Sequence, residues 1–332
     1  MKACHPRFRK RQKPTASPAQ TPAGFTRWRF FSNSHWSIAG KDLAGCAPTS
    51  LAVNLPGLQA GNRSKEEIKA MRQKYSVAEQ WRMLMEEGKT TVGRRRLAHF
   101  YALLPSSTRC KMCNVPFTGL IGQMMHLLGK NPSNFNPHLC SACDAFARAN
   151  PGGVEIRLSM LFADIRESTS LAERMNPAEF VKLIDRFFTT STDILSQTDA
   201  IIDKLAGDQV SGYYVPGLVV GANHARVAVQ AAQELRRAAG HGDPDGPWIP
   251  VGIGVHTGEA FIGAVGTRGG ITDITALGDA VNIAARLGAN ARPGEILVSQ
   301  ETCSDAGFDL GDLEQRELAL KGRSKSVLVY VF

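Results

Sequence analysis

Residues 158–171 read LSMLFADIRESTSL, and this stretch decides how the chain is expected to fold. Its first half is an apolar run typical of a strand from the middle of a sheet, and the run stops at a single carboxylate, Asp164. A Ser- and Thr-rich turn follows, in which Ser170 and Glu173 form a capping-box pattern, so Asp164 is not needed as a helix cap. The stretch predicts a strand over 155–164 that delivers an acid to a turn before a helix.

Composition bounds the class of protein. The chain has 332 residues, 43% of them apolar, which is enough for one large domain and a small one. The net charge is +9, but residues 1–60 contain nine Lys and Arg and one acid, Asp42, so this segment carries +8. We therefore expect residues 1–71 to be a basic, disordered tail; contact with a membrane surface or nucleic acid is the alternative.

Targeting signals are not evident in the sequence. No window approaches the about 18 to 20 apolar residues of a membrane span, and no apolar signal-peptide core follows the basic amino terminus. These patterns favour a cytoplasmic protein, in which the seven cysteines are thiols or metal ligands in preference to disulfides.

Residues 72–150 are predicted to form a small helical, zinc-ribbon-like domain. Helical periodicity begins at Ser76, with an interruption at Gly88 and an end at Pro105. Two C-x-x-C pairs follow, and their thiolates can hold one tetrahedral ion: Cys110, Cys113, Cys140 and Cys143. Structural zinc is favoured over an iron site, a redox dithiol or unmetallated thiols. His126 and His138 lie between the pairs and are expected to be ordinary surface or core residues.

Residues 151–332 alternate strands with helices after a Pro-Gly-Gly linker. Helices are predicted at 169–175, 177–197, 221–239 and 279–290, and a hairpin at AIIDKLAGDQVSGYYVP. The segment WIPVGIGVHTGEAFIGAVG is predicted to be two strands around a turn at His256–Gly258, and EILVS and SVLVYVF are further strands. Hairpins mixed with helices favour an α+β sandwich with a mixed or antiparallel sheet over a doubly wound parallel sheet.

Charged residues at turns and on one helix suggest chemistry. Asp164 and Asp208, each at a chain turn, would together suit a pair of hard divalent cations, although either acid could instead cap a turn. Asn282 and Arg286 share a face of an otherwise apolar helix, so the guanidinium requires an anionic partner. From this helix alone an internal Asp or Glu is preferred to a phosphate group. Lys204, considered by itself, is a solvated strand lysine.

Four motifs resemble one known family. FADIRESTSL, DKLAGD, VGIGVHTGEAFIGAVG and TALGDAVNIAARL have the order and spacing of the class III nucleotidyl cyclase catalytic domain, over about Glu155 to Phe332. The resemblance implies that Asp164, Ile165 and Asp208 bind two Mg²⁺ or Mn²⁺ ions. It also implies that ATP is converted to 3′,5′-cyclic AMP with release of pyrophosphate.

The resemblance assigns the nucleotide contacts as well. It implies that Lys204 and Thr275 read the purine base, as in the type b bacterial adenylyl cyclases, that Asn282 orients the ribose and that Arg286 stabilises charge at the transferring phosphate. Three further cations are candidates for the outer phosphates: Lys321, Arg323 and Arg268.

Family members act as head-to-tail dimers, which implies two shared sites in a homodimer and an inactive monomer. One subunit would give the two acids, and the other would give the residues that contact the base, ribose and phosphate. The chain departs from the family at Glu167, where Gly is common. An acid there would either repel the triphosphate or point outward harmlessly.

Two further functions are weighed against an active cyclase. A catalytically weak cyclase-homology domain could act as a dimerising regulator, which only the turn at Glu167 supports. The four-cysteine segment could instead serve as a nucleic-acid or interaction module. However, CKMCNVPFTGLIGQMMHLLGK has few aromatic residues and an apolar middle, which is typical of a packing or dimer surface.

Overall fold

The computed structural model describes residues 75–332 except residues 87, 89–91, 105, 107, 221–222, 268–271 and 321–324, and without the side chains of residues 92–95 and 204. The predicted basic tail lies outside the described residues. The described residues all belong to one compact unit that spans Gly57–Phe332. None of the helices described is both long and apolar enough to cross a lipid bilayer.

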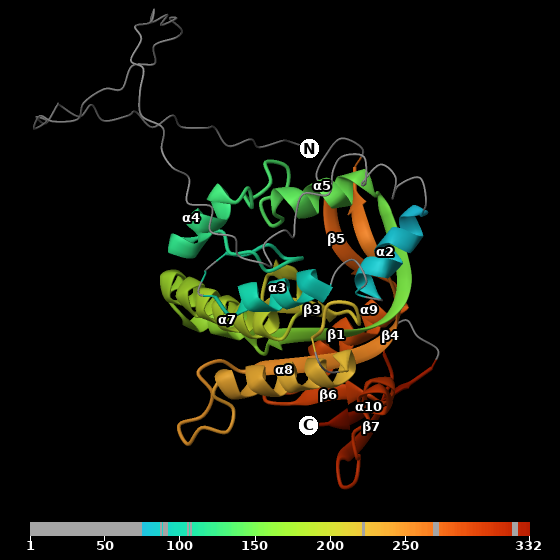
Figure 1. The fold of residues 1–332 in the computed structure, drawn as a ribbon. Coiled ribbons are helices and arrows are strands. Elements are labelled where there is room, and N and C mark those ends of the chain that lie inside the picture. The colour runs from blue at the N-terminus through green and yellow to red at the C-terminus, as the bar shows by residue number, and fades with distance from the viewer. Residues whose placement is uncertain are drawn as a thin grey trace, which may run out of the picture. The chain divides into compact units, whose positions relative to one another are not determined.

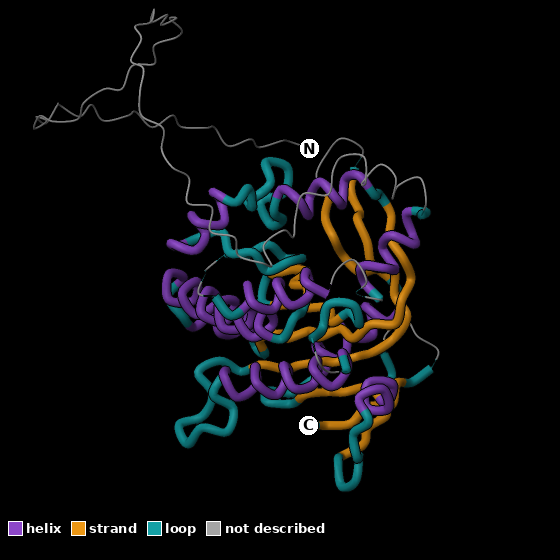
Figure 2. Tube along the Cα trace, in the orientation of Figure 1, coloured by secondary structure: helices purple, strands orange, loops and turns teal. Residues whose placement is uncertain are grey.

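A helical region precedes alternating strands and helices (Figures 1 and 2). The helices are α2 (Val77–Met85), α3 (Val92–Ala102), α4 (Gly119–Leu127), α5 (Ser141–Ala149), α6 (Ser168–Arg174), α7 (Pro177–Gln197), α8 (His224–Ala238), α9 (Asp279–Asn290) and α10 (Gln300–Ala306). The strands are β1 (Gly152–Ile165), β2 (Ile201–Ala206), β3 (Gln209–Tyr214), β4 (Val251–Gly266), β5 (Thr272–Leu277), β6 (Ile296–Ser299), β7 (Glu314–Leu318) and β8 (Val327–Val331). The sequence did not predict β5, β7 or α10.

The strands described form one mixed sheet. Their order is β2-β3-β1-β4-β6-β8-β7, and β5 pairs with β4 off this path. The β4–β6 pair is parallel, whereas the other pairs are antiparallel. With helices packed against the sheet, this arrangement confirms the predicted α+β class.

Strand β4 corrects one prediction. It is a single strand of 16 residues, with no turn at His256–Gly258. The polar residues that suggested a turn are instead buried and paired, because His256 Nδ1 lies 2.8 Å from Ser299 Oγ and Thr257 Oγ1 lies 2.7 Å from Ser159 Oγ. Gly258 stays in the ladder opposite Leu158 of β1.

Strand β1 separates two hydrophobic cores. Alternate side chains point to opposite faces of a strand, and both faces of β1 are buried through most of its length. Leu158, Met160 and Phe162 join a core with α2, α9 and the four-cysteine segment. Leu161 and Ala163 join the core formed with α7 and α8. The apolar run of the opening motif is therefore a central strand, as predicted.

Glycines in β4 let α9 lie directly on the sheet. A Cβ on Gly252 would come within 2.5 Å of the carbonyl oxygen of Ala291, and one on Gly254 would come within 2.1 Å of the amide nitrogen of Gly288. Valine and isoleucine occupy the alternate positions and fill the opposite core. The glycines of the VGIGVHTG segment therefore leave one face of β4 without side chains at these positions, and the backbone at α9 packs directly against it.

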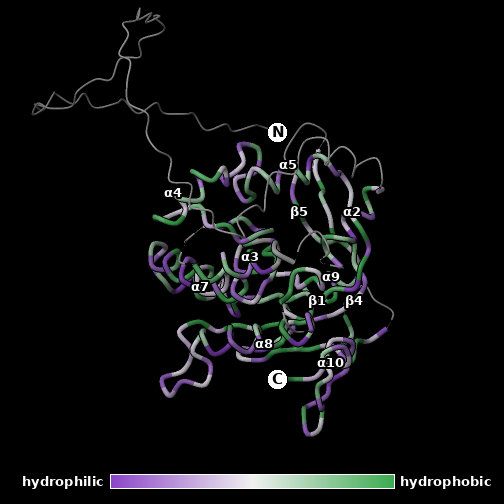
Figure 3. Tube along the Cα trace, viewed as in Figure 1, coloured by the Kyte–Doolittle hydropathy of each residue, from purple (hydrophilic) through white to green (hydrophobic). Residues whose placement is uncertain are grey.

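The four-cysteine segment lies beside β5. Helix α5 packs against β5 and β4, and Figure 1 shows α5 next to β5. Helix α4 carries much of the apolar sequence predicted to be a packing or dimer surface, and Figure 3 colours much of it hydrophobic. In the single chain Met125 of this helix is buried, whereas three large apolar side chains remain exposed: Leu120, Met124 and Leu127. Its role as a dimer surface stays a prediction.

Replacing Gly254 by alanine should destabilise the fold by about 1 to 3 kcal/mol, because the added Cβ must push α9 away from β4. The free energy of unfolding in urea measures this effect. Glu259→Ala, at an exposed position of the same strand, is the control and should change the stability by less than about 0.5 kcal/mol. Equal stabilities of the two variants would contradict the close approach of helix and strand.

Candidate active site and cysteine cluster

Two acids lie next to each other at the end of β1. Asp164 is the penultimate residue of β1, and Asp208 follows Gly207, whose φ of +65° makes the β2–β3 turn. The register pairs Asp164 with Gln209, and the amide of Ile165 donates to the carbonyl of Asp208 at 3.0 Å. The side chain of Ile165 is a buried hydrocarbon with no ligand atom, so only the backbone carbonyl of this residue could join the acids as a cation ligand.

Burial and neighbouring charges set the pKa of Asp164. Burial raises the pKa of Asp164 above its ordinary value and Asp208 raises it further, whereas Arg166 opposes the shift. Arg166 forms an ion pair with Asp164, and its guanidinium also donates to the carbonyl of Ala289 at 2.6 Å. The hydroxyl of Ser168 donates to the Asp208 carboxylate. Two partly buried carboxylates thus lie close together, and only Asp164 forms a described ion pair with the guanidinium. A divalent cation would offset the remaining negative charge.

The sequence reasoning missed Arg166, although a signal for it was available. Arg166 follows Asp164 by two residues at the end of one strand, and residues at that spacing share a face. Its amide donates to the carbonyl of Pro250 at 2.8 Å, which fixes the backbone just beyond β1. Arg166 therefore ties the end of β1 to the start of β4 and to the carboxyl-terminal end of α9.

Glu167 has a backbone conformation that favours glycine. Its φ is +57° and ψ is 28°, in the left-handed region. Its side chain is 71% exposed and lies 3.9 Å from Arg174. The side chain is therefore exposed to solvent in the single chain, and its effect on the triphosphate stays a prediction. Glycine adopts this conformation without the steric cost that a Cβ brings.

Helix α9 carries the next pair of predicted residues. Asn282 is exposed and Arg286 is half-buried, one turn further along the helix. Within the described part of the chain, no carboxylate forms an ion pair with Arg286, so the preferred internal Asp or Glu partner is not found there. Likewise, no described hydrogen bond or ion pair links Asp164 or Asp208 to Asn282 or Arg286. Arg286 thus remains available to an anion.

Strands β2 and β5 hold the two residues predicted to read the base. Thr275 is half-buried on β5 opposite Gly263 of β4, and Lys204 lies within β2. The β2–β3 register shifts between Ile202 and Leu205. Two β2 residues, 203 and 204, therefore lie opposite one residue of β3, which is a β-bulge. The other predicted phosphate contacts lie outside the described residues: Arg268, Lys321 and Arg323.

Tyr213 of β3 connects these two strands. Its hydroxyl donates to Asp203 Oδ2 at 2.9 Å, and Asp203 is the residue that precedes Lys204 in the chain. Burial and the Asp203 carboxylate raise the pKa of Tyr213 far above its ordinary value, while a hydrogen bond with Thr275 acts in the opposite direction. Thr275 and the β2 bulge therefore meet at one buried phenol.

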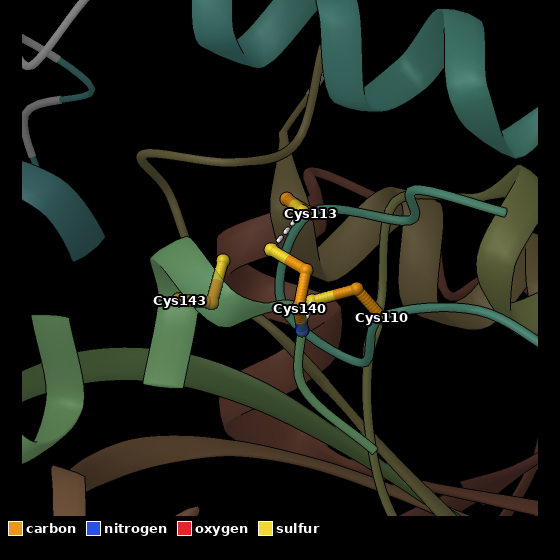
Figure 4. A group of neighbouring side chains, drawn as sticks. All are labelled: Cys110, Cys113, Cys140 and Cys143. Atoms are coloured by element: carbon orange, nitrogen blue, oxygen red, sulfur yellow. Dashed lines mark hydrogen bonds between the residues drawn. The ribbon is translucent and has the colours of Figure 1, made fainter. Parts of the chain in front are cut away.

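The four cysteines converge from the turn at Cys110–Cys113 and from the start of α5, where Cys140 is the N-cap (Figure 4). Their sulfur atoms all lie within 4.8 Å of one another, and Cys113 Sγ lies 3.7 Å from Cys140 Sγ. Four bonds of 2.3 Å in a tetrahedron place sulfur atoms about 3.8 Å apart. The amide of Cys140 donates to Cys110 Sγ at 3.2 Å, and Asn114 closes the first turn with a φ of +56°. The arrangement can hold one metal ion.

Thiol electrostatics agree with that capacity. All four cysteines are free thiols. Hydrogen bonds from the neighbouring thiols hold the pKa of Cys140 well below its ordinary value. The same neighbours and burial raise the pKa of Cys113 and of Cys143, because several thiolates this close repel one another. A cation would relieve this repulsion.

Comparison with known proteins gives the family. The profile of the adenylate and guanylate cyclase catalytic domain matches residues 155–332, just over half of the chain. The chain belongs to this family.

Curated relatives include adenylate cyclases. One from Anabaena cylindrica is 31% identical over 184 residues, which cover 52% of this chain and 36% of that protein. One from Mycobacterium tuberculosis is 30% identical over 169 residues, which cover 50% of this chain and 37% of that protein. The match thus spans little more than a third of the length of either relative.

Solved structures of both specificities are similar. The guanylyl cyclase Cya2 is 25% identical with a TM-score of 0.49, over 54% of this chain and 93% of that one. The adenylyl cyclase CyaB from P. aeruginosa is 27% identical with a TM-score of 0.46, over 53% of this chain and 93% of that one.

Glu167→Gly should stabilise the protein by up to about 1 kcal/mol, because glycine adopts a positive φ without the steric cost of a Cβ. Glu167→Ala is the control, since it removes the charge but keeps the Cβ, and it should bring no gain. Thermal and urea unfolding measure both. Equal stabilisation by the two substitutions would instead assign the effect to the loss of charge.

Metal removal should destabilise the protein. We expect purified protein to contain one zinc ion per chain, and expect Cys140→Ser to lose the metal together with about 3 kcal/mol of stability, roughly 6 to 12 °C in Tm. Metal analysis and thermal unfolding test this. Cys303→Ser, at a buried thiol outside the cluster, should retain the metal. Metal-free wild-type protein, or bound iron, would contradict the zinc assignment.

Proposed function

We propose that this chain is an adenylyl cyclase that converts ATP to 3′,5′-cyclic AMP and pyrophosphate. The observation that carries the proposal is the adjacency of Asp164 and Asp208 at the end of β1, in a chain of the cyclase family. Two oxygen-rich side chains and a nearby carbonyl suit hard divalent cations.

In this proposal each site residue has a separate role around the triphosphate. Two Mg²⁺ or Mn²⁺ ions bound by Asp164, Asp208 and the carbonyl of Ile165 would acidify the ribose 3′-hydroxyl and offset phosphate charge. Asn282 would orient the ribose for in-line attack on the α-phosphorus. Arg286 would stabilise the charge that develops there, and its lack of a described carboxylate partner supports this role.

ATP is the proposed substrate because of the residues on β2 and β5. A threonine hydroxyl at position 275 can accept a hydrogen bond from the adenine amino group, and Lys204 can donate to a ring acceptor of the purine. The adenylate cyclases among the curated relatives support the same choice.

The active unit is proposed to be a homodimer with two shared sites. Support comes from the absence of any described hydrogen bond or ion pair, within one chain, between the acids Asp164 and Asp208 and the α9 residues Asn282 and Arg286. One subunit would supply Asp164 and Asp208, and the other would supply Lys204, Thr275, Asn282 and Arg286.

The cysteine cluster is proposed to hold a structural zinc ion, because four sulfur ligands already complete a tetrahedron. Free thiols also suit a protein of the reducing cytoplasm, which we propose as its location. The alternative of a weak, regulatory cyclase-homology domain rests only on Glu167, whose side chain is exposed and lies near Arg174 in the single chain.

Purified protein incubated with Mn²⁺ should form cyclic AMP from ATP faster than cyclic GMP from GTP. Asp164→Ala and Asp208→Asn should each lower the rate at least about 100-fold, because each removes a charged cation ligand worth several kcal/mol. Asp185→Asn, an exposed acid on α7, is the control. No product from wild-type protein, or unchanged rates in the two site variants, would refute the proposal; faster GTP turnover would refute the base assignment.

A further inference from the structure

A buried lysine links the cysteine cluster to the sheet. Lys111 lies between the first two cysteines, and its side chain is only 8% exposed. Its ammonium nitrogen is 2.8 Å from Asp273 Oδ1 of β5, 3.3 Å from the carbonyl oxygen of Asp203 of β2 and 3.8 Å from Asp203 Oδ1. One cation of the cysteine turn therefore holds two strands of the cyclase fold together.

A second contact comes from the other half of the segment. Asn136 Nδ2 donates to the carbonyl of Thr272 at 3.0 Å and to Asp273 Oδ1 at 3.4 Å. The amide of Lys111 donates to the carbonyl of His138 at 2.9 Å, and the amide of His138 donates to Asn136 Oδ1 at 3.0 Å. Lys111 and Asn136 are thus parts of one hydrogen-bonded unit that reaches β5.

These contacts are made at the positions next to the base-reading residues. Asp203 directly precedes Lys204 in the β2 bulge, and the carbonyl bound by Lys111 belongs to the peptide that joins them. Asp273 precedes Thr275 by two residues, so the two share a face of β5. A β-bulge changes the direction of a side chain, and its geometry depends on where its unpaired groups bond.

We propose that Lys111 and Asn136 are positioning residues for purine recognition, holding β2 and β5 so that Lys204 and Thr275 face the same base. The inference rests on the proposed cyclase function. It adds a role for the cysteine cluster, because the turn closed by Cys110 and Cys113 fixes the backbone of Lys111. A cation bound there would stiffen the support of the base site.

A base-specific effect distinguishes positioning from general stabilisation. Pyrophosphate carries no base, so its inhibition of the enzyme reports the cation and phosphate part of the site alone. Loss of Lys111 should therefore weaken ATP binding without weakening pyrophosphate binding. A general loss of structure would weaken both.

The test uses full-length Lys111→Met, with KM and kcat for ATP and GTP and the inhibition constant of pyrophosphate. We expect the KM for ATP to rise on the order of five- to tenfold, the preference for ATP over GTP to fall, and kcat and pyrophosphate inhibition to stay within about twofold. Lys111→Arg should recover part of the loss, because it keeps the charge. Lys182→Met, an exposed lysine on α7, is the matched control.

A second, milder variant keeps the test valid if Lys111→Met fails to fold. Asp273 is 41% exposed, so Asp273→Asn should fold and show the same base-specific change at smaller size. Parallel changes in ATP and pyrophosphate binding, or kinetics of both variants that match Lys182→Met, would overturn the inference while leaving the proposed function intact. Absence of product from wild-type protein would refute the proposed function and this inference with it.

Discussion

The antiparallel pairing of β1 with β4 organises the sheet and the site. All 14 residues of β1 have a partner on β4, from Gly152 opposite Ala264 to Ile165 opposite Val251. Because the register is continuous, it fixes which side chains enter each core. It also sets Asp164 opposite Gly252, the position where β4 makes room for α9. The acid and the helix with Arg286 are therefore placed by the same ladder.

Charge is concentrated where this ladder ends. Asp164 and Arg166 at the end of β1 meet Asp208 of the β2–β3 turn, and each of the three is only partly exposed. Burial without full neutralisation is unfavourable for a carboxylate, and the raised pKa of Asp164 reflects that cost. Proteins retain such sites where a ligand of opposite charge completes them. Divalent cations are the simplest ligands that fit two carboxylates and leave room for a phosphate.

Sequence reasoning succeeded where a local pattern controls the structure. The apolar run ending at Asp164, the C-x-x-C pairs and the helix predicted over 177–197 each depend on patterns within one segment. It failed for β4 because His256, Thr257 and Gly258 have the composition of a turn. Their polar groups are satisfied by Ser299 and Ser159, far away in the sequence.

Interactions between distant segments were also invisible in the sequence. Nothing in the sequence singles out Lys111, because its partners are 92 and 162 residues away. Arg166, which forms an ion pair with Asp164, is only two residues away in the sequence. That ion pair can be expected only once the end of β1 is known to be partly buried. The outer-phosphate residues, Lys321 and Arg323, and the predicted domain boundaries stay predictions.

The cysteine segment and the cyclase fold share one hydrophobic core, so a structural change in one part can affect the other. Trp81, Val115 and Leu139 belong to the same hydrophobic cluster as Met160 of β1 and Ile262 of β4. Small segments with four metal ligands bury little apolar surface of their own, so this one gains stability by packing on the sheet. Protein interiors are close-packed, and a change in one part of a core is felt by its neighbours. A metal ion bound by the four cysteines would therefore be coupled to the geometry of β5, because the same packed layer and the same buried lysine connect the two.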